Sequence, residues 1–518
     1  MRQYFTPNLI GDIKILLYLQ NHIIHTLPRM QTKRIIIIGS GFSSLSAACY
    51  LAKEGYEVSI YEKNETIGGR ARQLKVNGFT FDMGPTFYWM PDIFDSFFAD
   101  FGKRTSDYYK LVRLNPGYEI YFGKQDSIAV SANIEEIYQT FEKEEAGSSK
   151  FLKKFLKTAA FNYRISIDKV IYKPGKSILE LIMPSTALRI FQFFTSISTA
   201  VRKNIKSIKL RQILEFPVIF LGAKPSKTPS FYCFMNHADM TLGTWHIQGG
   251  MFELVKGMQT LAESMGVEIY TSSHVGSIEV AQGKATGIKV NGELQRADLI
   301  ISGADYHHSE LLLKKEYRNY TEKYWKKKVL APSALLFYVG FNRKIERVSH
   351  HTLCFDTDFN LHAEKIYDTP DWPEKPLFYA SFPSITDDSL APEGKEAGIF
   401  LIPIAPGLKD SEELREYYFE QIITRLETLT NQEIRKEVLF HKSYCVSDFT
   451  RDYNAYKGNA YGLSNILLQT AFLKPKVQNK HVKNLLYTGQ LTVPGPGVPT
   501  TIISGKIAAE LAKTYLKK

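Results

Sequence analysis

The sequence predicts an α/β fold built around a parallel sheet. Residues 35–38 are four consecutive isoleucines, as a strand buried on both faces requires. A glycine-rich turn follows directly, and a helix pattern and a second strand pattern come after it. Residues 251–302 contain another run of helix and strand patterns. Hydrophobic residues make up 44% and charged residues 23% of the 518, which is typical of a folded globular chain.

The turn after the first strand has the spacing G-x-G-x-x-G, with serine in the last place, at Gly39, Gly41 and Ser44. Gly39 permits the tight turn, and Gly41 lets the backbone approach a pyrophosphate. Ser44 stands where a small residue serves close packing of helix on strand. The helix directs its first N–H groups, near Phe42 and Ser43, at the phosphates. The pattern predicts a Rossmann-like dinucleotide site.

An acidic residue follows the next strand at the distance that such a site needs. The segment VSIY ends at Tyr61, and Glu62 lies about 20 residues beyond the glycines. An acid there accepts a hydrogen bond from a ribose 2′-hydroxyl and leaves no room for a 2′-phosphate, which disfavours NADP. Lys63 comes next and is a further candidate contact. A glycine-rich turn without a ligand is the alternative, because the glycine spacing alone is a weak signal.

The net charge of +12 points to an anionic partner, either nucleic acid or an anionic membrane surface. No zinc-finger spacing, RNA-binding aromatic motif or arginine-rich arm occurs, so we expect no nucleic acid. The cysteines are far apart and form no CxxC pair, which argues against a disulfide framework and a metal site; they are Cys49, Cys233, Cys354 and Cys445. We therefore expect a reducing, cytoplasmic location.

The first thirty residues do not fit a targeting segment. The stretch IKILLYLQNHIIHTL has no small-residue cleavage site and is shorter than the roughly 20 apolar residues of a membrane span. Met30 lies just before the first predicted strand. Residues 1–32 form an N-terminal extension to the predicted domains, and we expect translation to begin at Met30, which would make Met1–Arg29 non-native; a start at Met1 is the alternative.

The residues after Glu62 carry a family resemblance. The run EKNETIGGRA, residues 62–71, resembles the flavin-containing amine oxidase and carotenoid desaturase superfamily. The resemblance implies FAD, with Gly69 and Arg70 near the diphosphate and flavin; an arginine beside two glycines can bring its guanidinium onto a phosphate. The remaining cofactor contacts that we expect from this block and from the middle of the chain are Gly84, Pro85, Thr86 and, through its backbone, Val275.

Two later segments narrow the resemblance to bacterial phytoene desaturases. They are LGTWHIQGGM in the middle of the chain and YTGQLTVPGPGVPTTIISGK near its end. The resemblance implies that the second segment binds FAD from the side opposite the first glycine turn, with a helix beginning near Pro499. The contacts expected there are Gly489, Gln490, Gly495, Gly497 and Val498. The chain departs from the family at Ser44, and at Gln490, where relatives often have Asp, Glu or Ala.

The resemblance also implies a domain organisation within the two-dinucleotide-binding superfamily. We expect a discontinuous FAD-binding domain from residues 33–115, 245–330 and 480–518, and an inserted α+β substrate domain from 116–244 and 331–479. Around 173–220 the chain is basic and apolar, and LRIFQFFTSISTAVRKNI, residues 188–205, predicts a helix with an apolar face and a basic end. Such a helix can dock peripherally on a membrane; a core helix with a solvated basic face is the alternative.

The chemistry that the resemblance implies is dehydrogenation of a C40 carotenoid, phytoene towards lycopene, by hydride transfer to flavin N5. Oxygen or a quinone would be the final electron acceptor, with NAD less favoured. Phe87, Tyr88 and Trp89 follow a Gly-Pro turn and are candidate substrate contacts, but core packing is the better interpretation for any single one of them. No catalytic base is identified: the segment GADYHH offers an acid and two histidines, but a role in capping a turn is the better interpretation; they are Asp305, His307 and His308.

Three alternatives remain within the enzymes and one outside them. A later-pathway carotenoid desaturase, such as a hydroxycarotenoid 3,4-desaturase, a ketolase or a saturase would share the same motifs. A lipid carrier resembling the Rab GDP-dissociation inhibitors would share the fold without flavin chemistry. Glu62, Gly69, Arg70 and the C-terminal turn argue against the carrier.

Overall fold

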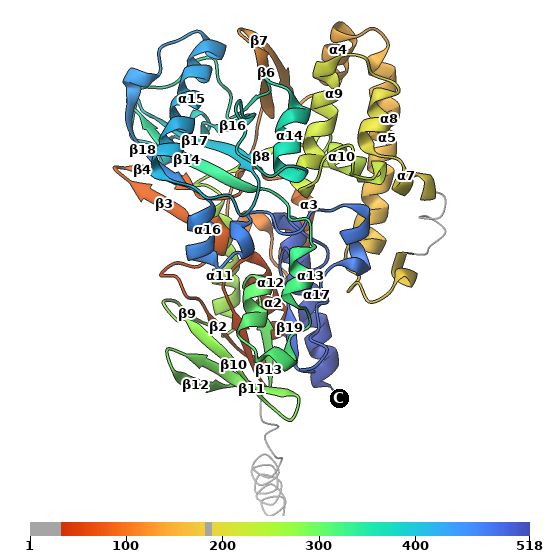
Figure 1. Ribbon diagram of the computed structural model, residues 1–518, viewed down its shortest axis with the longest axis vertical. Coiled ribbons are helices and arrows are strands. Elements are labelled where there is room, and N and C mark those ends of the chain that lie inside the picture. The colour runs from red at the N-terminus through yellow and green to blue at the C-terminus, as the bar shows by residue number, and fades with distance from the viewer. Residues whose placement is uncertain (1–32, 182–188, 518) are drawn as a thin grey trace, which may run out of the picture. The chain divides into compact units, whose positions relative to one another are not determined.

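The computed structural model describes residues 33–181 and 189–517. The expectations about residues 1–32 and about a start at Met30 therefore lie outside the described residues. Residues from Arg34 onward form one compact unit. Figure 1 shows a parallel sheet in its lower part, a larger sheet at the upper left and a group of helices at the upper right.

The lower sheet is parallel throughout and has the strand order β19-β13-β1-β2-β9. Its strands are β1 (Arg34–Ile38), β2 (Glu57–Tyr61), β9 (Glu268–Tyr270), β13 (Leu299–Ser302) and β19 (Leu485–Tyr487). The central strand β1 is buried on both faces, as its run of isoleucines predicts. Three segments far apart in the sequence thus meet in one sheet; the domain boundaries given above stay a prediction.

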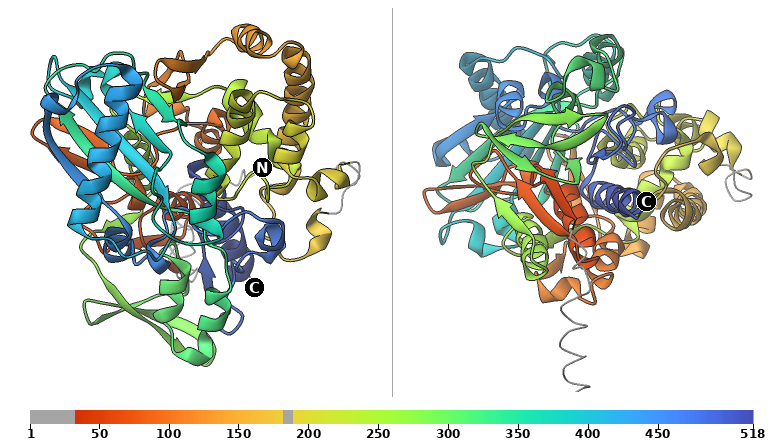
Figure 2. Two further views of the ribbon diagram at one scale, coloured as in Figure 1. Left: turned by 45° about the horizontal axis from the view of Figure 1, so that its top comes forward. Right: turned by 90° about the horizontal axis from the view of Figure 1, so that it is seen from below.

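Alternate isoleucines of β1 pack against different layers. Ile35 and Ile37 share a core with three helices, α2 (Phe42–Lys53), α11 (Phe252–Ser264) and α17 (Val498–Leu516). Ile36 and Ile38 face a three-stranded antiparallel sheet, β10 (Val275–Ala281), β11 (Lys284–Val290) and β12 (Glu293–Arg296). Seen from below in Figure 2, the small sheet and helix α17 lie on either side of the parallel strands.

The larger sheet has seven strands in the order β18-β14-β17-β16-β15-β6-β7. The neighbours pair antiparallel except β15 and β6. The strands are β6 (Tyr118–Gly123), β7 (Asp126–Val130), β14 (Ser333–Phe341), β15 (His351–Cys354), β16 (Phe378–Ser381), β17 (Glu396–Ile404) and β18 (Val438–Tyr444). Helix α15 (Glu412–Thr430) packs its apolar side chains on one face, which leaves the other face for the interior of the molecule.

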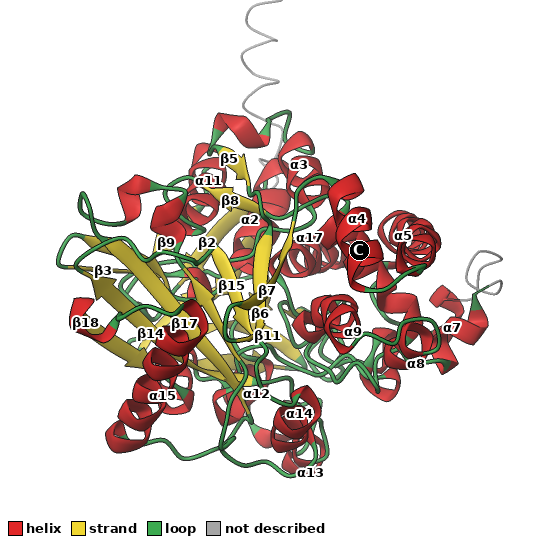
Figure 3. Ribbon diagram, turned by 90° about the horizontal axis from the view of Figure 1, so that it is seen from above, coloured by secondary structure: helices red, strands yellow, loops and turns green. Residues whose placement is uncertain are grey.

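A group of mostly short helices stands beside this sheet, at the right of Figure 3. It comprises α4 (Ile134–Glu144), α5 (Ser148–Ile165), α7 (Ile190–Phe194), α8 (Ile197–Arg202), α9 (Ile208–Glu215) and α10 (Phe234–Met240). The remaining elements with α-helix or strand structure are α3 (Pro91–Ala99), α12 (Tyr306–Leu311), α13 (Glu322–Lys326), α14 (Phe359–Tyr367), α16 (Val446–Tyr453), β3 (Gln73–Val76), β4 (Phe79–Asp82), β5 (Leu111–Arg113) and β8 (Trp245–Ile247).

The single helix predicted over residues 188–205 is wrong. Helix α7 ends at Phe194, and Ser196 begins α8 as its N-cap, where its hydroxyl accepts from the Thr199 backbone N–H. Ser196 also forms a β-bridge with Pro229, which fixes the break. A serine has good capping ability and poor propensity inside a helix, so the local chemistry favours two short helices. Among the described helices, none combines the length and the apolar composition needed to cross a bilayer.

Helices α2 and α17 touch through their backbones. A Cβ atom added at Gly505 of α17 would lie 2.3 Å from the carbonyl oxygen of Ser43 in α2. In the same crossing, the Ser46 hydroxyl donates to the carbonyl oxygen of Ile502 at 2.7 Å. Only glycine permits this approach, because any side chain would separate the two helices.

Replacing Gly505 with alanine tests this contact by the sign of its effect. Inside a helix, alanine is more favourable than glycine by about 1 kcal/mol, so the change would stabilise an open position. Here the added methyl group meets the Ser43 carbonyl, and we expect the free energy of unfolding to fall by about 1–3 kcal/mol, as in other overpacked cores. Urea denaturation followed by circular dichroism measures it, and a more stable variant would contradict the close crossing.

Candidate functional site

A cavity of about 820 Å³ lies between the parallel sheet, the larger sheet and the helices. Most of the residues proposed from the sequence line it. Those from the first part of the chain are Gly39, Gly41, Phe42, Ser43, Glu62, Lys63, Gly69, Arg70, Gly84, Pro85, Thr86, Phe87 and Trp89; Val275 comes from the middle, and Gly489, Gln490, Gly497 and Val498 come from the end. The fold thus brings the N-terminal glycine turn and the C-terminal turn to one cavity.

The first glycine turn has the conformation that its sequence requires. Gly39 has φ +85°, and a Cβ there would lie 3.4 Å from the backbone N of Ala304, so the turn and the end of β13 are close. Gly41 precedes α2 and has no atom within 4 Å of an added Cβ. No described side chain caps the helix, so its first N–H groups are left for a ligand. A Cβ at Gly69 would lie 3.4 Å from the Cα of Gly41, so this segment passes over the turn.

The Glu62 carboxylate is held in place from both sides. One oxygen accepts from the backbone N–H of Ser40 at 3.0 Å and from its hydroxyl at 2.8 Å. The other accepts from the backbone N–H of Asn64 at 2.9 Å. The Glu62 carbonyl accepts from the N–H of Ser273, two residues before Val275, at 2.7 Å. A carboxylate fixed at this position suits the hydroxyl groups of a ribose.

Arg70 supplies a partly buried positive charge. One terminal nitrogen donates to the carbonyl oxygen of Asn459 at 3.1 Å, and the guanidinium lies 5.2 Å from the centre of the Tyr453 ring. Its buried Nε has no hydrogen-bond partner among the described residues. Burial lowers the pKa of Arg70, but arginine starts so high that the group stays charged. A buried donor without a partner, next to the open N-terminus of a helix, fits a diphosphate.

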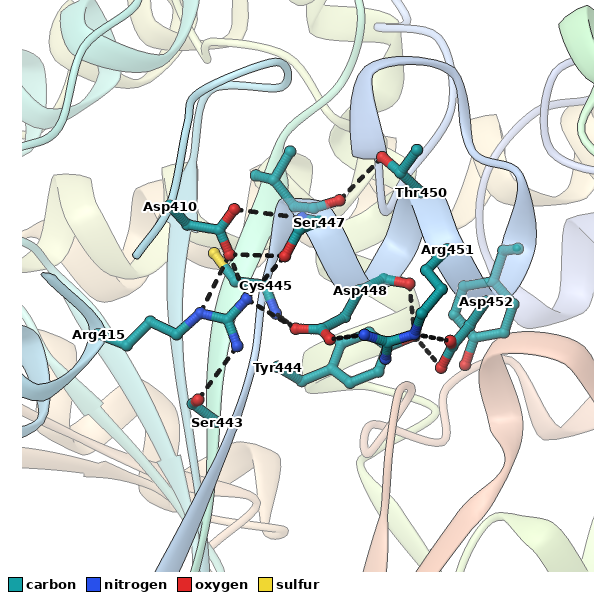
Figure 4. A network of polar contacts seen from close by, with 12 residues as sticks. Asp410, Arg415, Ser443, Tyr444, Cys445, Ser447, Asp448, Thr450, Arg451 and Asp452 are labelled. Carbon is teal, nitrogen blue, oxygen red and sulfur yellow. Dashed lines mark hydrogen bonds and ion pairs between the residues drawn. The ribbon is translucent and has the colours of Figure 1, made fainter. Parts of the chain in front are cut away.

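A network of ion pairs connects the larger sheet to this segment. Figure 4 shows Arg415 between Asp410 and Asp448, and Arg451 between Asp448 and Asp452. Asp452, in α16, also pairs with Arg72 at 2.8 Å, two residues beyond Arg70. Burial alone would raise the pKa of Asp452, but hydrogen bonds from Arg72 and Arg451 lower it. Lys63 donates to the carbonyl oxygen of Arg451 at 2.7 Å. These contacts hold α16 against the part of the cavity that Glu62, Lys63 and Arg70 line, which we call the nucleotide side.

The C-terminal turn presents the N-terminus of α17 to the cavity. Gly497 precedes the helix with φ +113°, and Pro499 lies in the first turn, as predicted. No described side chain caps this helix either. Ser504 accepts a hydrogen bond from the backbone N–H of Gly489 through its hydroxyl at 3.0 Å, which ties the two ends of the turn together. The Gln490 side-chain amide meets the Asn459 side chain at 3.2 Å.

Three of the proposed residues lie outside the cavity lining. Ser44 is buried against Gly303. A Cβ added at Gly303 would lie 2.0 Å from the Ser44 hydroxyl oxygen, so Ser44 serves the close packing expected of its position. Gly495 has φ +137° and faces Asn465 and Lys474. Tyr88 does not line the cavity and packs in the core, which is the alternative given for it above. Its hydroxyl bonds to that of Tyr109 at 2.9 Å, in the hydrophobic core.

The acid and histidines of GADYHH have structural partners. Asp305 is the N-cap of α12 and accepts from the backbone N–H of His307, as the capping interpretation predicts. His308 lies beside Asn454, with 3.2 Å between its Nε2 and the amide nitrogen. Burial lowers the pKa of His308 to about 4. His308 and Asn454 line the cavity near Lys63, on the nucleotide side.

One polar pair in the cavity wall has no counterpart among the sequence predictions. Tyr379 in β16 lines the cavity, and its hydroxyl lies 2.8 Å from that of Thr86. The same hydroxyl lies 2.7 Å from Nδ1 of His351 in β15. Neither residue belongs to a local motif, and only the pairing of the two strands brings them together.

The family model for "Flavin containing amine oxidoreductase" matches residues 42–512. A carotenoid 3,4-desaturase of Haloarcula japonica is 39% identical over 92% of this chain and 97% of its own. A 4,4'-diapophytoene desaturase of Staphylococcus haemolyticus is 31% identical over 92% and 98%. A zeta-carotene-forming phytoene desaturase of Myxococcus xanthus is 29% identical over 94% and 95%.

Solved structures of low sequence identity share the fold. An oxidoreductase from Methanosarcina mazei has a TM-score of 0.60 at 16% identity and covers 94% of this chain and 100% of its own. A putrescine oxidase redesigned in its cofactor binding has a TM-score of 0.59 at 12% identity, over 93% and 99%. The chain belongs to the flavin containing amine oxidoreductase family, in its carotenoid desaturase branch, and is an FAD-dependent oxidoreductase. This membership disfavours the carrier without flavin.

Replacing Gly497 with valine tests whether the turn before α17 helps to hold FAD. Valine strains a backbone with φ +113°, and its Cβ would approach the Thr500 hydroxyl at 3.0 Å, so the N-terminus of α17 must shift. We expect the purified variant to lose FAD, measured as flavin absorbance per protein. Gly292→Val is the control, because Gly292 has φ +92° in a turn with no atom within 4 Å of its Cβ. A variant at position 497 that retains FAD like the control would contradict this role.

Proposed function

We propose that this FAD enzyme removes two hydrogens from a C40 carotenoid and so introduces a carbon–carbon double bond. The observation that carries the proposal is the cavity, which extends from the two helix N-termini to a wall of aromatic and aliphatic side chains. Residues of that wall include Phe87, Trp89, Phe216, Phe355, Leu401 and Leu353. When bound, FAD supplies a two-electron acceptor, which no side chain can provide.

In this proposal the protein binds FAD and the carotenoid, orients them, and keeps water away from the reacting carbons. A long hydrocarbon gains little from hydrogen bonds, so its affinity comes from shape and dispersion contacts with the apolar wall. The same wall excludes water from the reacting carbons. Glu62, Arg70 and the two helix N-termini would hold FAD by its ribose and diphosphate, at the polar side of the cavity.

Sequence similarity favours a later carotenoid over phytoene. The carotenoid 3,4-desaturase is 39% identical, whereas the phytoene desaturase is 29% identical over a similar share of the chain. We therefore prefer desaturation of a C3–C4 bond to the conversion of phytoene expected from the sequence. No contact in the described residues specifically favours a ketolase or a saturase. Oxygen or a quinone is the proposed final acceptor.

Product analysis with purified, FAD-loaded protein tests this choice. Liposomes would carry either phytoene or a conjugated acyclic carotenoid with a saturated C3–C4 bond, with oxygen, a quinone or NAD as the acceptor. We expect the conjugated carotenoid to gain a double bond and a longer-wavelength spectrum, with oxygen or the quinone. The Gly497→Val variant serves as the FAD-poor control. Conversion of phytoene alone would reverse the substrate choice, and no conversion of either would refute carotenoid desaturation.

We further propose that the protein docks on a membrane around the mouth of the cavity. Phe194 and Leu468 are 74% and 76% exposed and also line the cavity, so they lie where it meets solvent. Leu179 and Phe191 are 71% and 81% exposed in neighbouring segments. Exposed apolar side chains together with a net charge of +12 suit an anionic bilayer, in which a carotenoid would dissolve.

Flotation with anionic liposomes tests the docking surface. We expect the wild type to float with the vesicles and the double variant Phe191→Asp/Phe194→Asp to remain with the soluble protein, because two charges oppose insertion of this rim. The control is Leu361→Asp/Leu439→Asp, which changes two exposed leucines that do not line the cavity. If the control lost binding to the same extent, general charge rather than the rim would account for docking.

A further inference from the structure

A tyrosine and a histidine form a polar pair in the wall of the cavity. The Tyr379 hydroxyl lies between the Thr86 hydroxyl, at 2.8 Å, and Nδ1 of His351, at 2.7 Å. Tyr379 lines the cavity, whereas His351 is 0% exposed behind it. An imidazole within hydrogen-bond distance of a hydroxyl is the arrangement that moves a proton to or from that oxygen.

Strand pairing makes this contact a fixed part of the sheet. In the antiparallel register of β15 and β16, Leu353 pairs with Tyr379 and His351 pairs with Ser381. His351 and Tyr379 are therefore diagonal neighbours on one face, at a separation that long side chains bridge. The Phe87 ring stacks on the His351 ring with 3.9 Å between centres and 13° between planes, which holds the imidazole in place.

The proposed desaturation leaves a proton without an acceptor. Two hydrogens leave the substrate, and the electron pair goes to FAD with one of them, so the second hydrogen must leave as a proton. Resting on that proposed function, we propose that Tyr379 is the catalytic residue that accepts this proton at its hydroxyl oxygen, as its own proton moves to Nδ1 of His351. When the product has left, the reverse transfer through the Tyr379 oxygen returns the proton to water.

The electrostatics suit a neutral acceptor. Burial, together with neighbouring His246, lowers the pKa of His351 well below its usual range, so the imidazole is neutral and able to accept. Burial raises the pKa of Tyr379, so the phenol keeps its proton until the reaction requires it. A carbon next to a developing polyene cation is a strong acid, for which a weak neutral base suffices. The transfer requires the tautomer with the proton on Nε2, and the stacked Phe87 face favours the imidazolium that forms briefly.

Four other acids and histidines that could accept a proton lie away from the apolar wall or behind the cavity lining. Asp305 caps α12 and His308 lies with Lys63 and Asn454 at the nucleotide side. His246, near the pair, lies 3.2 Å from Asp387 through Nε2, and Asp387 also accepts from the Gly249 backbone. Neither His246 nor Asp387 lines the cavity.

Two variants and one matched control test the transfer. Tyr379→Phe removes the accepting oxygen, and His351→Asn keeps an acceptor near Nδ1 that cannot take a proton. We expect both to lower kcat by about 100-fold, the range of general acid–base catalysis, with KM, FAD content and thermal stability close to wild type. A solvent deuterium isotope effect on the wild-type kcat should change in both. His350→Asn is the control, because His350 is buried and its ring packs on the His351 ring, but its Nδ1 bonds to Thr386 and not to Tyr379.

Each outcome bears on the inference. Wild-type kcat in His351→Asn would show that His351 only positions the tyrosine and would overturn the transfer, as would wild-type kcat in Tyr379→Phe. A raised KM or lost FAD in place of a lowered kcat would assign the pair to binding and also overturn it. The substrate is the carotenoid that the wild type converts, so failure of the proposed function appears in the wild type and failure of this inference appears only in the variants.

Discussion

The close crossing of α17 over α2 is the constraint on which the rest of the site depends. Gly505 lets α17, the last described helix, touch the backbone of α2, the first described helix, at Ser43. Both helices begin at the same cavity, and both N-termini lack a capping side chain among the described residues. Two uncapped N-termini concentrate free N–H groups and positive dipole ends at one place, which suits the diphosphate and the reduced flavin. A protein without an anionic ligand would gain more by capping them.

The ion-pair network at α16 has a related consequence for the two sheets. It runs from α15 and β18 of the larger sheet to Arg72, beside the segment that crosses the first glycine turn. Apart from the exposed Arg451, the side chains of these pairs are mostly buried, and a connected network of this kind restricts movement of the parts it joins. The network therefore keeps the larger sheet, which supplies Leu353 and Leu401 to the apolar wall, in a fixed position relative to the segment around Arg72.

The sequence predicted the features that depend on local backbone chemistry. The glycine turn, the acid after the second strand and the helix start near Pro499 each follow from neighbouring residues, and the structure has them. Predictions that needed tertiary information were less reliable. Tyr88 looked like Phe87 and Trp89 in sequence, but only the Tyr109 partner places it in the core. A broken helix at Ser196 depended on the strand-like bridge to Pro229. Tyr379 and His351 lie on different strands, so no spacing rule could join them.

The apolar wall also limits which groups can act as a base inside it. An unpaired carboxylate or ammonium placed against a hydrocarbon loses its hydration and is destabilised by several kcal/mol unless a partner neutralises it. The side chains in contact with Tyr379 include Thr86, His351 and Phe87, and these three are uncharged in the resting state. Charge forms there only while the substrate itself is becoming cationic and losing its proton. A neutral phenol supported by a neutral imidazole thus reconciles the two demands on this cavity, which must bind a hydrocarbon at rest and accept a proton during the reaction.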